Sequence, residues 1–283
     1  MVQISGVIHT YNEEKNIANA IRSLLPWVSE VVVIDMHSED RTREIAESLG
    51  ARIVLHERLQ FADPARDFGI AQTCCDWIIT IDADEMVPAP LALRLCQIAE
   101  SDSADVVMIF FHDFILGSPF AGAGWGLGHE FHPRFFRKGA VRFPPYVHAH
   151  HEFSEAARVI RLEPSEDLAI VHFNYRNAEH VLYKLNRYTQ LEAEGRRARG
   201  VRCSEISAVR AAVRSFASRY LYRRGYRLGW RGLFMCTVMV MYEIAAFTKQ
   251  IELEEESVFG PVEDRYAAKA ASVLEGFRCR LET

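Results

Sequence analysis

The first part of the chain alternates two hydrophobic patterns. Runs that are apolar at almost every position are typical of strands buried on both faces of a sheet. They occupy residues 4–9, 31–35, 52–55, 77–82 and 104–111. Between them, apolar residues recur every three or four positions, which predicts helices over about 13–25, 40–49, 64–73 and 88–100. Strands and helices in this order predict an α/β fold with a mainly parallel sheet and right-handed crossovers.

The pattern changes in the second half of the chain. Residues 117–145 show neither periodicity and are rich in Gly, Pro, His and aromatic side chains, which predicts a long functional loop. Helical spacing then returns at about 178–194, 204–224 and 230–251, before a charged tail from Glu252. We therefore expect a ligand-binding and catalytic α/β domain over residues 1–175 and a helical region over residues 176–283.

Composition narrows the class of protein. The net charge of -5 argues against a nucleic-acid-binding protein, and 49% hydrophobic residues are ordinary for a soluble globular domain. No signal peptide and no uninterrupted apolar run of membrane-spanning length are present, and the six cysteines form no CxxC pair, so we expect a cytoplasmic protein with reduced thiols. The charge is uneven, because residues 206–242 contain seven arginines and no acidic residue.

Polar residues follow several of the predicted strands. Asp35 ends the second strand, Asp82 and Asp84 follow the fourth, and Asp113 follows the fifth. In a parallel sheet, ligands bind at the carboxyl ends of the strands. Asp82 and Asp84 are two positions apart, so they point to the same side and could hold a divalent cation, and through it a diphosphate. The plain alternative is an acidic turn in solvent, with Thr10 or Asn12 capping the first helix.

Five segments in this order resemble the family 2 inverting glycosyltransferases of the GT-A fold. They are His9–Glu14, VVVIDMHSEDRT at 31–42, DWIITIDADE at 76–85, the Gly-Trp loop up to Arg137, and the C-terminal helices. RFFR at 134–137 and KLNRYT at 184–189 are most similar to the soluble subgroup that includes bacterial lipopolysaccharide-core glucosyltransferases. The resemblance implies transfer of a hexose from a UDP-sugar to a hydroxyl of a glycolipid or glycan, with Mg²⁺ or Mn²⁺ as cofactor.

The same resemblance implies a role for individual residues. The nucleoside would lie against Thr10, Tyr11, Asn12, Glu13 and Asp35, with Tyr11 stacking on the base and Asp35 at its edge. Asp84 would bind the cation, Asp82 would reach the ribose or the cation, and Ala83 lies between them. Apart from the resemblance, the histidines are dense around Val147, and we expect His148 or His172 to contact the metal or the diphosphate. The alternatives are a zinc site at His148 and His150 and ordinary hydrogen-bonded loop histidines. Arg66 and Arg134 are candidates for the phosphates, although Arg66 could equally be an exposed charge on a helix.

Inversion requires a base that deprotonates the acceptor hydroxyl on the side opposite the leaving group. The resembling subgroup carries an acidic residue shortly before its R-L-F-R segment, and counting back from Arg134 gives Glu130. This chain has two extra residues between Trp125 and Arg134, and a Glu where Asp is common. Asp113 is the reserve candidate for the base.

The arginine-rich stretch permits three interpretations. It could form a helix pair resting on anionic lipid headgroups, a packed apolar face with solvated arginines, or a nucleic-acid surface. The first suits an enzyme with a membrane glycolipid acceptor at the inner face of the cytoplasmic membrane. The C-terminal helices could also pair in a homo-oligomer.

Other functions remain open at this point. A sugar nucleotidyltransferase would need a Gly-rich, Arg-containing loop after the first strand, which residues 10–14 do not form. A polyprenyl-phosphate sugar synthase would need a clearer membrane anchor, and a protein acceptor is a further alternative. A non-catalytic membrane or nucleic-acid docking scaffold has no use for the row of carboxylates at Asp82, Asp84 and Glu130.

Overall fold

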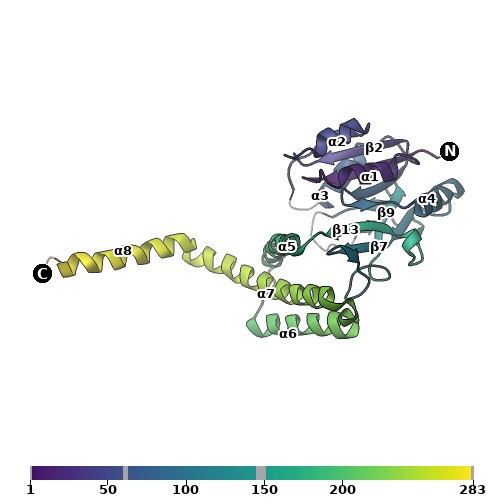
Figure 1. Ribbon diagram of the computed structural model, residues 1–283. Coiled ribbons are helices and arrows are strands. Elements are labelled where there is room, and N and C mark those ends of the chain that lie inside the picture. The colour runs from purple at the N-terminus through teal and green to yellow at the C-terminus, as the bar shows by residue number, and fades with distance from the viewer. Residues whose placement is uncertain (1, 60–62, 145–150, 282–283) are drawn as a thin grey trace. The chain divides into compact units, whose positions relative to one another are not determined.

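The computed structural model describes residues 2–59, 63–144 and 151–281, with the side chains of 63, 64 and 276–281 left out (Figure 1). The chain forms two compact units. The first unit comprises Met1–Leu182 and Ala217–Cys236, and the second comprises Tyr183–Phe216 and Thr237–Thr283. Each unit is described by itself below.

The first unit is built on a seven-stranded sheet of described residues, in the order β12-β6-β9-β4-β1-β2-β3. Every pair in it is parallel except those that β9 makes with β4 and β6. The expected α/β fold with a mainly parallel sheet is therefore confirmed. The strands are β1 (Ile4–Thr10), β2 (Glu30–Asp35), β3 (Arg52–Leu55), β4 (Trp77–Asp82), β6 (Val106–Ile109), β9 (His132–Arg137) and β12 (Val159–Arg161).

Helices cover both faces of this sheet, which is why its central strands are apolar at nearly every position. Ile4 and Ile8 of β1 pack in one core with α1 and α4, whereas Val7 packs in a second core that includes Ile70 of α3. Alternate residues of one strand thus enter opposite layers. The helices are α1 (Ile17–Leu24), α2 (Thr42–Ser48), α3 (Asp63–Ala71) and α4 (Ala89–Ser101).

A smaller sheet lies beside the carboxyl end of β4, in the order β5-β13-β7-β8. Its central strand places His172 opposite Glu85 on one side and opposite Asp113 on the other. The single strand expected over 104–111 is divided at Phe110 between the two sheets. The strands are β5 (Glu85–Met86), β7 (Phe111–Ile115), β8 (Ser118–Pro119) and β13 (Ile170–Tyr175), and β10 (Val141–Arg142) pairs separately with β11 (Glu152–Phe153).

The C-terminal part is helical, as expected, and the stretch expected as a charged tail is helical too. It contains α5 (Ala178–Ala198), α6 (Glu205–Phe216), a π-helical turn η2 (Ala217–Tyr222), η3 (Gly225–Leu228), α7 (Gly229–Phe259) and α8 (Val262–Leu281), after the short η1 (Glu166–Leu168). Within the second unit, Lys249 of α7 donates to the Thr189 hydroxyl of α5 at 2.9 Å. Residues 225–259 are long and apolar enough to cross a membrane by length and composition, with 28% of the apolar window buried.

Candidate functional site

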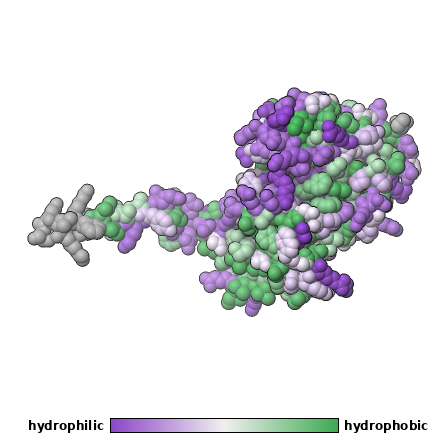
Figure 2. All heavy atoms as spheres, viewed as in Figure 1, coloured by the Kyte–Doolittle hydropathy of each residue, from purple (hydrophilic) through white to green (hydrophobic). Residues whose placement is uncertain are grey.

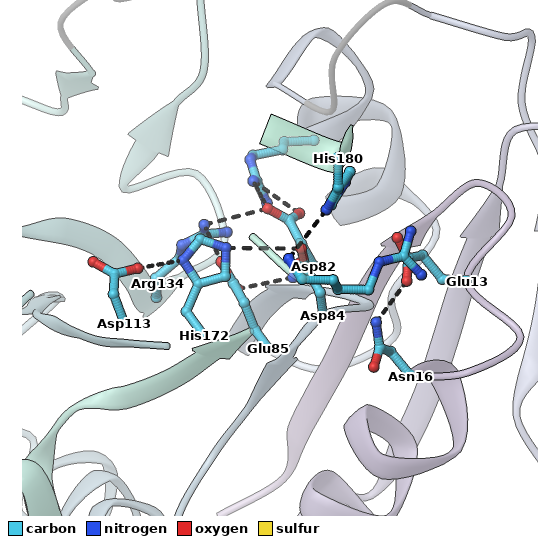
Figure 3. A network of polar contacts seen from close by, with 11 residues as sticks. Glu13, Asn16, Asp82, Asp84, Glu85, Asp113, Arg134, His172 and His180 are labelled. Carbon is cyan, nitrogen blue, oxygen red and sulfur yellow. Dashed lines mark hydrogen bonds and ion pairs between the residues drawn. The ribbon is translucent and has the colours of Figure 1, made fainter. Parts of the chain in front are cut away.

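Asp82, at the end of β4, is held by a buried arginine (Figure 3). Nη2 of Arg66 in α3 donates to both carboxylate oxygens of Asp82 at 3.0 Å, and Nη1 donates to the Thr80 hydroxyl at 3.2 Å. Burial alone would raise the pKa of Asp82, but Arg66 and Arg134 outweigh it and hold that pKa below its ordinary value. Arg66 is only 3% exposed, so the alternative of an exposed helix charge is wrong.

A second buried pair lies next to the first. Nη2 of Arg134 in β9 donates to Glu85 Oε1 at 2.8 Å, and the backbone N–H of Asp82 donates to Glu85 Oε2 at 2.9 Å. Burial raises the pKa of Glu85 to about 7, against the opposing charge of Arg134. Glu85 was not among the residues to which the sequence assigned a role. Glu85 is the last residue of the DADE motif, and its side chain is buried in the protein interior. The motif was therefore the feature of the sequence that could have identified it.

Asp84 faces an imidazole contributed by the smaller sheet. Nε2 of His172 lies 3.8 Å from Asp84 Oδ2, and Nδ1 lies 2.8 Å from Asp113 Oδ1. The backbone N–H of Phe173 donates to the carbonyl of Asp84 at 2.9 Å, which fixes the two strands together. Burial would lower the pKa of His172, but the hydrogen bond to Asp113 and the charges of Asp84 and Glu85 outweigh burial and raise it.

Asp113, the reserve candidate for the base, is 4% exposed, and both of its carboxylate oxygens contact protein groups. Besides its contact with His172, it accepts a hydrogen bond at Oδ2 from the backbone N–H of Gly126 at 2.8 Å. Glu130 differs in its surroundings, because it is exposed at the end of the loop that contains Gly126. His148, a candidate metal ligand, lies outside the described residues.

The loops after β1 and β2 are joined by hydrogen bonds. Asn12 has a positive φ of 53°, which Asn tolerates better than most residues. Its backbone N–H donates to the Ser38 hydroxyl at 2.9 Å, and its side-chain oxygen accepts from the backbone N–H of Glu39 at 2.8 Å. The backbone N–H of Glu13 donates to the Thr42 hydroxyl at 2.8 Å. Asn12 therefore shapes the loop and does not cap α1.

Three further predicted residues lie at these strand ends. Asp35 is fully buried, and its Oδ1 accepts the backbone N–H of Ser38 at 2.9 Å. Its Oδ2, like the hydroxyl of Thr10, is buried with no hydrogen-bond partner among the described residues. The Arg58 guanidinium lies 4.2 Å from the centre of the Tyr11 ring. An unpaired buried carboxylate oxygen is costly, which makes Asp35 a natural acceptor for a ligand N–H.

Ala83 is buried between the two aspartates, and its backbone N–H donates to the carbonyl of His9 at 3.1 Å. The site thus gathers the predicted residues of β1, β2, β4 and β9 at one end of the sheet. Figure 3 shows Asp113 and Glu13 on opposite sides of Asp84, so the site has two distinguishable flanks.

Known proteins resemble this chain in sequence and in structure. The sequence model of Glycosyl transferase family 2 matches residues 5–158. An uncharacterized glycosyltransferase of Rickettsia bellii is 26% identical over 263 residues, which cover 90% of this chain and 87% of the relative. One from Rickettsia typhi is 36% identical over 105 residues, 37% of this chain and 36% of the relative. Glucosyl-3-phosphoglycerate synthase of Mycobacterium tuberculosis, in complex with Mn²⁺, UDP and glucosyl-3-phosphoglycerate, superposes with a TM-score of 0.47 at 18% identity, covering 72% of this chain and 82% of that one.

Proposed function

This chain belongs to glycosyl transferase family 2, and we propose that it is a metal-dependent, inverting hexosyltransferase. The donor is a UDP-hexose, and the acceptor is a hydroxyl of a glycolipid or glycan such as lipopolysaccharide core. The observation that carries the proposal is the pairing of Asp84 with His172 at the carboxyl end of β4, beside two carboxylates that arginines neutralise.

Asp84 and His172 are the ligands proposed for Mg²⁺ or Mn²⁺. Asp84 Oδ2 and His172 Nε2 lie 3.8 Å apart, and a carboxylate oxygen and an imidazole nitrogen are both groups that would hold a divalent cation. Asp113 accepts the Nδ1–H of His172 and so directs Nε2 toward Asp84. When bound, the cation stabilises the negative charge of the departing diphosphate. Asp82 is held by Arg66 and is assigned to the ribose or to the edge of the cation site.

The nucleoside is assigned to the loops after β1 and β2. Asp35 Oδ2 and the Thr10 hydroxyl offer buried polar atoms without partners, and the uracil N–H is a suitable donor for that carboxylate. Tyr11 supplies a ring for stacking, while Asn12 and Glu13 hold the loop in position. Arg134 is assigned to a phosphate, because its Nη1 is buried and unpartnered among the described residues while Nη2 holds Glu85. Arg66 is assigned to holding Asp82.

Glu130 is the proposed base. The acceptor oxygen forms a bond to the anomeric carbon as the bond to the diphosphate breaks, and the hydroxyl proton passes to the Glu130 carboxylate. Exposure at the end of the loop suits this role, since the acceptor arrives from solvent. Asp113 is less suited, because both of its oxygens already accept hydrogen bonds.

The acceptor side is proposed to meet an anionic membrane surface, which would make the enzyme cytoplasmic and peripheral. In the first unit, Tyr222 and Trp230 are 85% and 62% exposed, and the neighbouring Arg224 and Arg227 are exposed as well. In the second unit, α6 exposes Ile206, Val209 and Val213 at helical spacing, and Figure 2 shows apolar surface over this helix. Exposed aromatic and apolar side chains next to arginines are typical of interfacial segments.

Calorimetric titration of the purified protein with UDP, GDP, CDP and dTDP, each with and without Mn²⁺, tests the proposal. We expect only UDP to bind tightly, only with the metal, and we expect Asp84→Asn to remove the metal-dependent part. Asp167→Asn, a carboxylate change in η1, is the matched control. Metal-dependent UDP binding that survives unchanged in Asp84→Asn, or no binding of any nucleotide, would overturn the proposal.

A further inference from the structure

Two neighbouring cysteines, Cys74 and Cys75, lie beside a carboxylate at the end of the sheet away from the candidate site. They come shortly before β4, and their neighbour Glu30 is the first residue of β2. Asp82 is the last residue of β4, so about 20 Å of extended strand separates the cysteines from the candidate site. This group of side chains is therefore too far away to take part in the sugar transfer proposed above.

The three side chains bring their ligand atoms close enough for one small ion. Cys74 Sγ lies 3.7 Å from Cys75 Sγ, and a carboxylate oxygen of Glu30 lies within 4.8 Å of both sulfurs. Both cysteines are free thiols. Two thiolates bound to one tetrahedral zinc ion by bonds of about 2.3 Å would lie about 3.8 Å apart. The separation of the two sulfurs therefore matches a shared zinc ion.

Hydrogen bonds from the backbone and from β1 orient this group. The backbone N–H of Cys74 donates to Glu30 Oε1 at 2.7 Å, and that of Cys75 donates to the Ser5 hydroxyl at 3.2 Å. The Ser5 hydroxyl donates in turn to Glu30 Oε1 at 2.6 Å. Arg52 takes a third acceptor position of Glu30, at 3.2 Å from Oε2, and a carboxylate has about four. Contacts of this kind fix metal ligands in place.

The chain just before the cysteines is also held by two long cationic side chains. Arg52 Nη2 donates to the carbonyl of Gln72 at 2.6 Å, and Lys138 Nζ donates to the carbonyl of Thr73 at 2.7 Å. The turn between α3 and β4 is thus joined to β3 and to the segment after β9. The position of the two thiols therefore depends on the fold and not only on their adjacency in the sequence.

The protonation of the group suits an ion that displaces protons. Burial works to raise the pKa of Glu30, but hydrogen bonds lower it to about 2, so the carboxylate is ionised at neutral pH. Hydrogen bonds with Glu30 and Cys75 raise the pKa of the Cys74 thiol to about 11. A thiol that keeps its proton is a poor nucleophile, which argues against a catalytic cysteine here.

We propose that Glu30, Cys74 and Cys75 bind Zn²⁺. Thiolates select zinc and softer metals, whereas Mg²⁺ and Mn²⁺ prefer oxygen ligands. Two S–H bonds break as two Zn–S bonds form, and the two protons pass to solvent. Because Cys74 is exposed, water can take the fourth position of the tetrahedral ion. The ion would join the turn before β4 to the first residue of β2.

Titration with Cd²⁺ tests the site, because cadmium bound by thiolates absorbs in the ultraviolet and cadmium bound only by oxygen and nitrogen ligands lacks this band. The full-length protein is first reduced and freed of metal with EDTA, and both reagents are then removed. We expect a thiolate band that saturates at about one Cd²⁺ per chain and that added Zn²⁺ removes. A wild-type protein without a saturating band would overturn the proposal.

Three variants distinguish the site from ordinary thiol chemistry. Cys74→Ser should weaken Cd²⁺ binding at least as much as the about 10–100-fold that follows loss of a residue supporting a ligand. Cys96→Ser, in α4, is the matched control and should bind like the wild type. Equal binding by these two variants contradicts the site. Urea unfolding without metal should be unchanged in Cys74→Ser, because this side chain is exposed.

Glu30→Gln keeps both thiols and removes the third ligand. We expect Cd²⁺ binding to weaken about tenfold or more in this variant. Binding as tight as in the wild type would mean that two adjacent thiols capture the ion without the fold, which would overturn the proposed three-ligand site.

Discussion

Six ionisable side chains meet in three pairs at the carboxyl end of β4. Arg66 holds Asp82 and Arg134 holds Glu85, whereas Asp84 faces the imidazole of His172. Burial disfavours the ionised form of both carboxylates, and the charges of the buried arginines oppose this effect. The arrangement keeps two acids in place beside the proposed cation ligand while reducing their mutual repulsion. The contribution of these pairs to folding stability can be tested separately from the role of the site in catalysis.

Replacing Arg66 with Met should destabilise the protein by about 3–5 kcal/mol, because a buried charge loses its partner. Urea unfolding followed by circular dichroism measures the change. Arg41→Met is the control, since Arg41 forms a well-shaped but exposed ion pair with Glu44 at 2.9 Å and should matter little. Similar stabilities for the two variants would show that the Arg66–Asp82 pair contributes no more than a surface contact.

The two candidates for the base should separate in kinetics. Glu130→Gln should leave UDP–Mn²⁺ affinity unchanged and lower the transfer rate about 10²–10⁴-fold, as loss of a general base does. Asp113→Asn should instead weaken Mn²⁺ binding about 10–100-fold, because it supports the proposed ligand His172. Full transfer activity in Glu130→Gln would show that Glu130 is not the base. Unchanged Mn²⁺ affinity in Asp113→Asn would show that Asp113 does not support a metal ligand.

Several residues of the candidate site were predicted from the sequence to lie together. Asp35 and Asp82 end strands and Asp84 follows just after β4, and the ends of parallel strands meet at one edge of the sheet. Glu85 could not be assigned a role from the sequence. Its significance depends on its ion pair with Arg134, which is distant in the chain and adjacent only in the fold.

Among the elements, β1 to β4 were predictable because each contains a short run of apolar, mostly β-branched residues beside a helical pattern. β9 was not, although it lies in the middle of the sheet between β4 and β6. Its sequence, HPRFFR, places the charged Arg134 among buried positions, and only the pairing with Glu85 makes that acceptable. The strand expected over 104–111 was wrong in its extent, because the chain changes sheets at Phe110.

Glu30 joins the first strands of the sheet and gives a pH-dependent prediction. Its Oε1 accepts hydrogen bonds from the Ser5 hydroxyl at 2.6 Å and the backbone N–H of Cys74 at 2.7 Å, and Arg52 lies 3.2 Å from Oε2. Burial works to raise the pKa of Glu30, but these hydrogen bonds outweigh it and lower the pKa to about 2. The ionised form thus stabilises the fold at neutral pH.

Glu30→Gln should therefore lower the free energy of unfolding at pH 7 by about 1 kcal/mol, a small value because solvent partly screens the group. The folded pKa lies below the unfolded one, so the wild-type advantage is complete above the unfolded value of 4.5 and is lost as the pH falls toward 2. Urea titrations at several pH values measure this. Glu39→Gln, at an exposed position after β2, is the control, and a gap between wild type and Glu30→Gln that does not change with pH would contradict the assignment.

For the molecule as a whole, the exposed residues within 222–230 of the first unit form the surface proposed to contact the membrane that carries the acceptor. Tyr222 and Trp230 are exposed beside Arg224 and Arg227, while Arg219 and Arg223 are drawn against the Gly-Trp loop. The arginines of one short segment therefore differ in their surroundings. Those on the surface are proposed to contact lipid headgroups.

This membrane contact can be tested with the double variant Arg224→Gln/Arg227→Gln. Each arginine near an anionic membrane contributes about 1 kcal/mol, so binding to phosphatidylglycerol vesicles should fall about 30-fold, and added salt should weaken the wild type toward the variant. Arg41→Gln/Arg94→Gln removes the same charge from exposed positions elsewhere and should leave vesicle binding unchanged. Equal losses in the two double variants would mean that net charge alone governs binding. Unchanged UDP–Mn²⁺ affinity in Arg224→Gln/Arg227→Gln would separate the membrane surface from the proposed nucleotide site.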